Sequence, residues 1–199
     1  TEDRKEQIYE TATHLFARRG YNGASMRDIA RALDLQGGSL YSHIAAKEEL
    51  LGTILDRAAE QFLAAITPIA SGDLPPAAKL RAAVHAHVEV VTANLEAATV
   101  YFHEWKFLTG ARREAFLARR RQYEQLMRSI VVEGIAAGVF RPEVDPKFAT
   151  LAILSLVNWL YTWYDPEGEL SPAEIADTFL RLLLNGLLRQ EQPLGEVYE

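Results

Sequence analysis

A short stretch near the N-terminus is rich in polar side chains of the kinds that contact DNA. A glutamine can make two hydrogen bonds to the edge of an adenine, and tyrosine, histidine and lysine can donate to phosphate oxygens. We expect contacts with base edges from Gln36, Gly37, Ser39 and Ser42, with Gly38 in the same turn. We expect contacts with phosphates from Ser25, Arg27, Tyr41, His43 and Lys47.

Three short helices are predicted to position these residues. The first ends at Gly20, which suits the left-handed position after a helix, and the second begins at Ser25, with Asp28 completing a capping box. A break over residues 34–38 precedes a third helix around residues 39–44. The apolar positions that should pack these helices together are Ile8, Ala12, Leu15, Phe16, Ile29, Ala30, Leu33, Leu35, Leu40 and Ile44. Such an arrangement is typical of a helix-turn-helix.

The segment from Gly20 to Leu51, GYNGASMRDIARALDLQGGSLYSHIAAKEELL, resembles the signature of the tetracycline-repressor (TetR) family. The matching positions are Gly20, Ser25, Ile29, Ala30, Gly38, Leu40, Tyr41, His43, Lys47, Glu48 and Leu50. The resemblance implies a repressor with a DNA-binding head and a larger helical body that binds an effector and forms a homodimer. Outside such a motif, we would interpret Tyr41 as a core aromatic residue and His43 as a solvated one.

The segment departs from the family signature at three positions. Asp34 replaces the usual glycine, Gln36 stands where serine or threonine often caps the recognition helix, and Ile44 stands where phenylalanine is common. Because aspartate tolerates left-handed geometry, we expect the turn at Asp34 to form.

Composition restricts the class of protein. The chain has 199 residues, of which 49% are hydrophobic and 24% are charged, as expected of a globular protein. It has no cysteine, so a disulfide framework and a thiolate metal site are excluded. The N-terminus is charged and amphipathic, unlike a signal peptide, and we expect a cytoplasmic protein. Residues 148–164 are apolar but short and interrupted by polar residues, so we expect a buried helix and no membrane partner.

Charge is distributed unevenly along the chain. Residues 1–47 carry seven Lys/Arg and six Asp/Glu, whereas residues 48–199 carry fourteen and twenty-one. We therefore expect a DNA-binding domain at residues 1–47 and an acidic effector-binding and dimerisation domain at residues 48–199. The few cations of the head must be well placed, because phosphate neutralisation dominates affinity for DNA.

Helical periodicity covers almost the whole chain, which predicts an all-α fold: an N-terminal three-helix head plus a six-helix body, nine helices in total. In the body we expect helices over about residues 46–67, 76–95, 112–137, 145–164 and 171–189, and a sixth that carries Tyr101, Trp105 and Leu108. Pro68 and the run at residues 71–76 should end the long helix. Gly110 and Gly138 should end the helices that precede them, and Ser171 with Glu174 should form another capping box.

One stripe of the helix at residues 112–137 predicts an internal cavity. Its members are Phe116, Arg120, Tyr123, Met127, Ile130 and Gly134. Because arginine is rarely buried unpaired, Arg120 should face either an internal carboxylate, such as Glu104 or Glu89, or an anionic ligand. The nearby Arg112, Arg113, Arg119 and Arg121 form either a solvated helix face or a site for a phosphorylated effector. The candidate ligand-binding residues are Trp105, Arg112, Arg113, Phe116, Arg119, Arg120, Tyr123 and Met127.

The C-terminal half carries a second resemblance. Residues 138–142, 158–164, 168–171 and 186–187 are similar to TetR-type regulators of fatty-acid, phenylacetate and steroid degradation. Members of that group commonly respond to acyl-CoA thioesters, so the resemblance implies a medium- or long-chain acyl-CoA effector and no cofactor. A TetR-type repressor that senses another apolar or aromatic ligand is the alternative.

The last two helices carry more apolar surface than one hairpin can cover. The candidate dimer-interface residues are Leu151, Leu154, Asn158, Trp159, Phe179, Leu182, Leu183 and Gly186. Pairing with a two-fold copy would form a four-helix interface and supply the second recognition helix for a palindromic operator.

Catalytic and metal-binding patterns are weak. The sequence contains no nucleophile elbow and no Gly-rich phosphate loop, so we do not expect an enzyme. His85, His87 and His103 lack the i, i+4 spacing of a metal pair, and we expect ordinary hydrogen-bonded histidines and no metal. Trp105, Phe102 and Phe107 are expected to be core residues rather than pocket lining.

Overall fold

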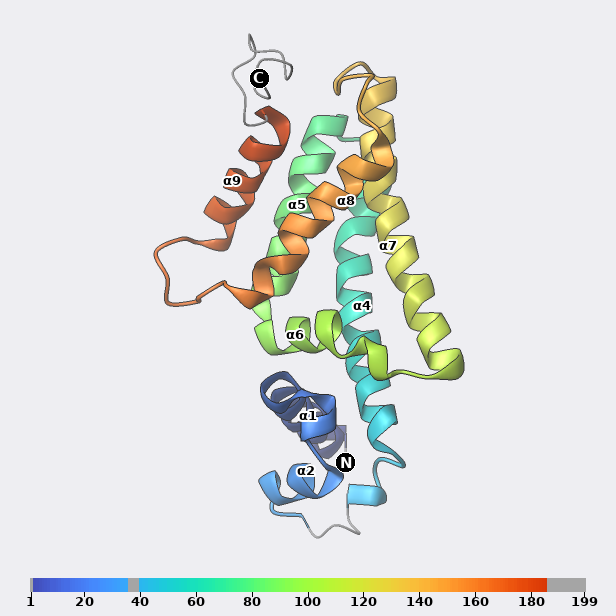
Figure 1. Ribbon diagram of the computed structural model, residues 1–199, viewed down its shortest axis with the longest axis vertical. Coiled ribbons are helices and arrows are strands. Elements are labelled where there is room, and N and C mark those ends of the chain that lie inside the picture. The colour runs from blue at the N-terminus through green and yellow to red at the C-terminus, as the bar shows by residue number, and fades with distance from the viewer. Residues whose placement is uncertain (1, 36–39, 186–199) are drawn as a thin grey trace, which may run out of the picture.

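The structure is a computed structural model that describes residues 2–35 and 40–185. Within those residues helices are the only regular secondary structure, which confirms the all-α prediction (Figure 1). The eight α-helices are α1 (Glu2–Gly23), α2 (Met26–Ala32), α4 (Lys47–Ser71), α5 (Pro76–Ala93), α6 (Leu95–His103), α7 (Gly110–Ala136), α8 (Pro146–Asn158) and α9 (Pro172–Asn185). Two 3-10 helices are η1 (Trp105–Phe107) and η2 (Trp159–Thr162). The ninth predicted helix, around residues 39–44, begins outside the described residues.

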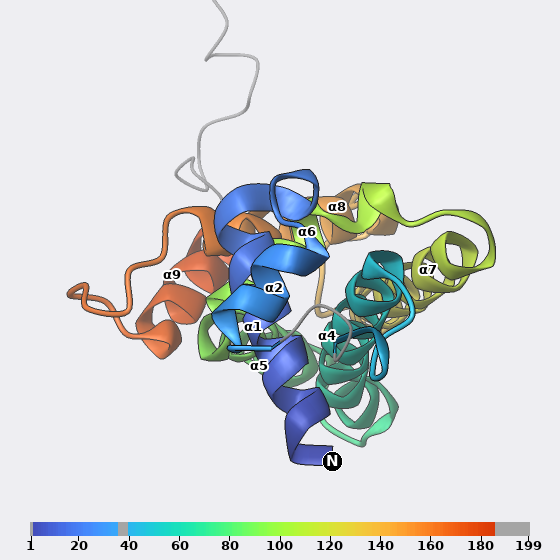
Figure 2. The same ribbon diagram turned by 90° about the horizontal axis from the view of Figure 1, so that it is seen from below.

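The head is formed by α1, α2 and the residues that follow them. Figure 2 shows α1 and α2 beside the first turns of α4. Gly20 has a φ of 72°, but its ψ of 161° differs from the left-handed helical value, and one more helical turn follows as far as Gly23. The capping box of Ser25 and Asp28 is present, and Asp34 adopts a φ of 52° as expected. Leu40 and Ile44 are buried and close the core of the head.

A single long helix, α4, connects the head with the body (Figure 1). Helix α4 passes Pro68, near which we expected it to end, and stops at Ser71, the first residue of the run at residues 71–76 that was also expected to end it. A proline this close to the C-terminus removes only one hydrogen bond of the helix. Ile66 on the preceding turn is buried, and Ile69 packs against the core, so packing holds the last turn in place.

The segment between α5 and α7 differs from the single helix that we expected. Asn94 ends α5 and caps α6, its Oδ1 accepting a hydrogen bond from the Ala97 N–H at 2.9 Å. Helix α6 stops at His103, Trp105 lies in η1, and Leu108 is extended and buried. Helix α6 lies between the head and the remaining body helices (Figure 1), so it contacts both.

The C-terminal helices form the far side of the body. Gly138 has a φ of 68° and ends α7 as expected. The helix expected to reach residue 164 stops at Asn158 and tightens into η2. The Ser171–Glu174 capping box is present, with the Ser171 N–H donating to Glu174 Oε2 at 2.9 Å. Helix α9 packs on α5, separated from α8 by a long loop.

Candidate effector site and DNA-contacting surface

The exposed side chains of the head match part of the predicted DNA surface. Tyr41 is 57% exposed, and Arg27 and Ser42 are also exposed. His43 is half-buried. Exposure of Tyr41 is inconsistent with the alternative of a core aromatic residue. The predicted base-contacting residues Gln36, Gly37, Gly38 and Ser39 lie outside the described residues.

Two predicted phosphate contacts are instead used inside the head. Lys47 Nζ donates to the carbonyl oxygens of Tyr21 at 2.7 Å and Ala24 at 2.8 Å, and it lies 4.1 Å from the centre of the Tyr21 ring. The Ser25 hydroxyl is used in the capping box with Asp28. Lys47 therefore joins α4 to the end of α1 rather than pointing outward, and partial burial lowers its pKa.

A cavity of about 230 Å³ lies in the body among α4, α5, α6, α7 and α8. Its wall consists of Phe62, His87, Tyr101, Phe102, Leu117, Arg120, Arg121, Tyr123, Glu124, Leu154 and Asn158. Of the predicted ligand-binding residues, only Arg120 and Tyr123 are part of this wall. Phe116 and Met127 are buried beside it in the core, and Arg112, Arg113, Arg119 and Trp105 lie elsewhere.

Arg120 does not form the internal ion pair that was one of its two predicted interactions. Among the described residues, neither Glu104 nor Glu89 pairs with it. Glu104 accepts instead from the Tyr21 N–H at 2.8 Å and contacts the His103 ring. The Arg120 Cζ lies 5.4 Å from the centre of the Trp105 ring, and Arg113 lies 5.7 Å from the same ring. Trp105 is thus flanked by two guanidinium groups, one of which borders the cavity.

Of three further arginines on α7, two face α4 and one faces the cavity. Arg119 pairs with Glu60 at 3.1 Å and with Asp56 at 3.9 Å, both on α4, and Arg112 packs closely against Gly52 of the same helix. These two arginines therefore join α7 to α4 and do not reach the cavity. Arg121, which we placed only in the general cluster, borders the cavity.

The inner wall of the cavity is aromatic. Phe62 lies at its centre, with ring centres 4.9 Å from His87, 5.0 Å from Tyr101 and 5.7 Å from Tyr123. Burial lowers the pKa of His87 to about 3 and raises the pKa of Tyr101 to about 12, so both groups are uncharged near neutral pH. This inner part of the wall therefore offers an apolar surface with few, uncharged polar atoms, whereas the charged side chains Arg120, Arg121 and Glu124 line the rest of the cavity.

The sequence interpretation missed several wall residues. Phe102 was assigned to the core, and nothing distinguished Phe62 or Leu117 from other apolar residues of their helices. His87 stands on the buried face of α5 between the fully buried Val84 and Val88. A polar residue in an apolar stripe was the one signal available.

The three body histidines are hydrogen-bonded, as expected. His85 contacts Asp177 at 2.7 Å, His87 contacts the Tyr123 hydroxyl at 2.8 Å, and His103 contacts Glu104 at 3.2 Å. No group of residues within the described part of the chain is arranged to hold a metal ion. Nor is any described helix both long and apolar enough to span a membrane.

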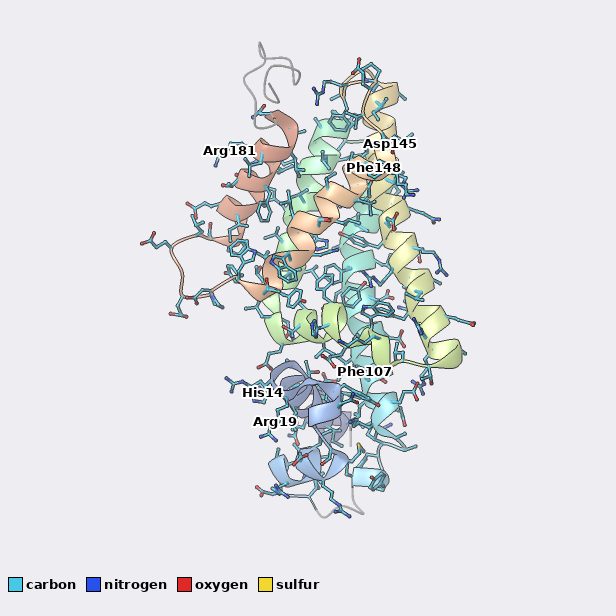
Figure 3. The ribbon with its side chains drawn as sticks, viewed as in Figure 1. His14, Arg19, Phe107, Asp145, Phe148 and Arg181 are labelled. Carbon is cyan, nitrogen blue, oxygen red and sulfur yellow. The ribbon has the colours of Figure 1, made fainter. Side chains whose placement is uncertain are left out.

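The predicted dimer surface is partly exposed. Trp159 is 63% exposed, Leu151 and Leu182 are also exposed, and Phe179 and Leu183 are half-buried. Leu154 and Asn158 instead border the cavity, and Gly186 lies outside the described residues. Phe148 on α8, which was not predicted, is 68% exposed (Figure 3). Helix α8 therefore has one face toward the cavity and another that is exposed when only the described residues are considered.

Comparison with known proteins agrees with this arrangement. Residues 8–54 match the family of bacterial regulatory proteins, tetR family, and residues 73–187 match the tetracyclin repressor-like C-terminal domain. The transcriptional repressor KstR2 of Rhodococcus jostii is 28% identical, over 92% of this chain and 91% of its own. PfmR from Thermus thermophilus, a TetR family transcriptional regulator, is 34% identical over 92% of this chain and 99% of its own, with a TM-score of 0.84.

AibR was solved in complex with isovaleryl coenzyme A and operator DNA. It is 32% identical over 91% of this chain and 98% of its own, with a TM-score of 0.83. The family matches cover the head and most of the body, and these relatives match along nearly their full lengths. The chain therefore belongs to the tetR family of bacterial regulatory proteins and is a regulator rather than an enzyme.

Proposed function

We propose that this protein is a transcriptional repressor that binds a palindromic operator as a homodimer and is released by an acyl-CoA thioester. The head, residues 1–47, carries the DNA contacts, and the body, residues 48–199, binds the effector and pairs the protomers. Because a repressor must share a compartment with the chromosome, the proposal includes a cytoplasmic location.

The DNA-binding part rests on the head. Arg27 and Tyr41 are exposed, while Leu40 and Ile44 anchor the third helix from inside. A recognition helix held in this way presents one face to the major groove, and a two-fold copy places the second helix roughly 34–36 Å away. The operator complex of AibR, a relative of similar fold, supports this role.

The observation that carries the effector proposal is the aromatic cavity with arginines at its edge. Arg120 and Arg121 border it, and Arg113 continues the cationic surface across Trp105. Guanidinium groups suit the phosphates of coenzyme A, and an aromatic cavity suits an acyl group. The isovaleryl coenzyme A bound to AibR supports the same class of ligand.

The size of the cavity bears on the acyl group. Its volume of about 230 Å³ lies below the roughly 300–1,000 Å³ of pockets that enclose drug-sized ligands. A short or branched acyl group suits this space better than the medium- or long-chain group expected from the sequence.

Release of operator DNA tests the proposal directly. A fluorescent operator fragment, selected from genomic DNA by retention on the protein, is titrated with acetyl-, isovaleryl-, octanoyl- and palmitoyl-CoA. We expect isovaleryl-CoA to release the DNA at the lowest concentration, and free isovalerate with free coenzyme A to release none. Release by the free acid would contradict the role of the arginines. Release by no thioester would favour a repressor with another apolar or aromatic effector.

A further inference from the structure

Among the described residues, the cavity wall contains one buried side-chain polar atom without a hydrogen-bond partner. His87 is 2% exposed, and its Nδ1 lies 2.8 Å from the Tyr123 hydroxyl. Its Nε2 is buried and has no hydrogen-bond partner among the described residues. Both residues border the cavity. Buried polar atoms of native proteins are nearly always paired, so an unpaired atom beside a cavity needs an explanation.

The hydrogen-bonding role of this atom follows from Tyr123. The Tyr123 hydroxyl is buried too, and Nδ1 of His87 is its only hydrogen-bond partner within the described residues. If Nδ1 carried the proton, the phenol hydrogen would have no acceptor. If instead the Tyr123 O–H donates to Nδ1, the proton of the neutral ring is on Nε2, and Nε2–H is the one donor left unpaired. Only this second arrangement places the unpaired donor at Nε2, where an acceptor bound in the cavity would satisfy both donors.

We propose that His87 determines effector specificity by donating a hydrogen bond from Nε2–H to a carbonyl oxygen of the effector's acyl group. This inference rests on the acyl-CoA function proposed above. The carbonyl is either the thioester's own or an additional oxo group on the acyl chain, since both present the same acceptor.

A structural role alone does not account for His87. Nδ1 has a structural role, because it pairs the buried Tyr123 hydroxyl, but this role leaves Nε2 unexplained among the fully buried apolar neighbours Val84, Val88 and Val91. A ligand that lacks an acceptor would leave Nε2–H buried and unpaired, and sites of that kind discriminate strongly between ligands.

Access to Nε2 requires a small opening of the wall. Phe102, whose ring centre lies 6.4 Å from that of His87, is half-buried, whereas Phe62, Tyr101 and Tyr123 are buried. Phe102 is therefore the wall ring that can move with the least loss of packing. It belongs to α6, so its displacement would act on the helix that contacts the head.

Three ligands and three proteins test the inference. The ligands are isovaleryl-CoA, its thioether analogue without the thioester carbonyl, and an oxoacyl-CoA of similar size. The proteins are the wild type, the double variant His87→Phe with Tyr123→Phe, which removes both hydrogen-bonding partners together, and His87→Gln, whose amide N–H lies near the position of Nε2. Affinities are measured by calorimetric titration, after circular dichroism melts establish that each variant is folded.

We expect the wild type to bind its carbonyl-bearing ligand about tenfold more tightly than the matched ligand without that carbonyl. If the thioether binds more weakly than isovaleryl-CoA, the acceptor of the His87 hydrogen bond is the thioester carbonyl. If the oxoacyl-CoA binds more tightly than isovaleryl-CoA, the acceptor is the additional carbonyl of the acyl chain. The preference should vanish in the double variant and persist in His87→Gln. Equal wild-type affinities, or a preference that survives in the double variant, would overturn the role of His87 and leave the acyl-CoA effector standing. Binding of no thioester would overturn both.

Discussion

Glu104, directly after α6, accepts a hydrogen bond from the backbone N–H of Tyr21 in α1 at 2.8 Å. Its side chain is almost entirely buried, and Phe107 stacks on the Tyr21 ring with centres 5.3 Å apart. Tyr101 and Phe102, at the end of α6, form part of the cavity wall. Figure 3 shows Phe107 at the junction of head and body. The same short segment thus forms part of the cavity wall and holds the head.

Replacing Glu104 by alanine should weaken the coupling between cavity and head. The Tyr21 N–H would lose its acceptor, so we expect a loss of about 1–3 kcal/mol in stability. The free variant should bind isovaleryl-CoA about as tightly as the free wild type. In the wild type we expect operator-bound protein to bind the ligand more weakly than free protein, and this difference should be smaller in the variant. Glu104→Gln, which retains an acceptor oxygen, serves as the control. Coupling equal to the wild type in Glu104→Ala would show that this contact does not transmit the effector signal.

Lys47 is expected to act as an internal link of the head. Lys47→Met removes two hydrogen bonds to the carbonyl groups of Tyr21 and Ala24, and it leaves the Tyr21 oxygen with only the long contact from the Ala24 N–H at 3.5 Å. The free energy of unfolding in urea should fall by about 1–3 kcal/mol. Lys5→Met, at an exposed position of α1, should leave it nearly unchanged. If both variants unfold alike and only Lys47→Met loses affinity for DNA, Lys47 is a phosphate contact after all.

Features determined by neighbouring residues were predictable from the sequence. The capping boxes at Ser25 and Ser171 and the left-handed conformation of Asp34 depend on a few adjacent residues, and all three formed. Pro68 shows the limit of such rules, because packing of the surrounding turns outweighs one lost hydrogen bond.

The lining of the cavity was less predictable than these local features, because its residues come from five different helices. The stripe on α7 correctly included two wall residues, Arg120 and Tyr123. Which arginines of α7 form ion pairs, however, depends on where α4 lies, as the pair of Arg119 with Glu60 shows. The interaction of Lys47 likewise depends on where the end of α1 lies. Periodicity within one helix carries no information about these partners.

The stability of the protein should depend on pH through His87. Burial lowers its pKa to about 3 in the folded state, whereas the unfolded chain has an ordinary value near 6.5. Between these values the unfolded chain binds a proton that the folded protein does not, so stability falls as the pH falls through this window, by at most about 1.4 kcal/mol per pH unit.

Urea unfolding from pH 7 to pH 4, at one protein concentration, measures this slope. His87→Phe should flatten it. The slope is compared rather than the absolute stability, because His87→Phe also leaves the Tyr123 hydroxyl without a partner. A slope that is the same in wild type and His87→Phe would mean that His87 is charged in the folded protein.

The exposed apolar residues of α8 and η2 should form the dimer interface. Trp159→Glu places a charge where we expect a buried contact, and it should weaken dimerisation by about 2 kcal/mol or more. Analytical ultracentrifugation over a range of concentrations measures the change. Leu74→Glu, at a position that is 49% exposed in the loop before α5, is the matched control. A dimer that tolerates Trp159→Glu as well as Leu74→Glu would place the interface elsewhere.

Arg119 and Arg120 are adjacent on α7 but should differ in their effect on the effector. Arg120 borders the cavity, whereas Arg119 is held by Glu60 and Asp56 on α4. Arg120→Ala should weaken binding of isovaleryl-CoA about tenfold and reduce its dependence on salt, because a charge-assisted contact with phosphate is lost. Arg119→Ala should leave affinity unchanged and cost at most about 1 kcal/mol of stability, since its ion pairs are exposed. Calorimetric titration at two ionic strengths separates these effects. Equal losses of affinity in the two variants would indicate that the net positive charge of α7, rather than the position of Arg120 at the cavity, attracts the ligand.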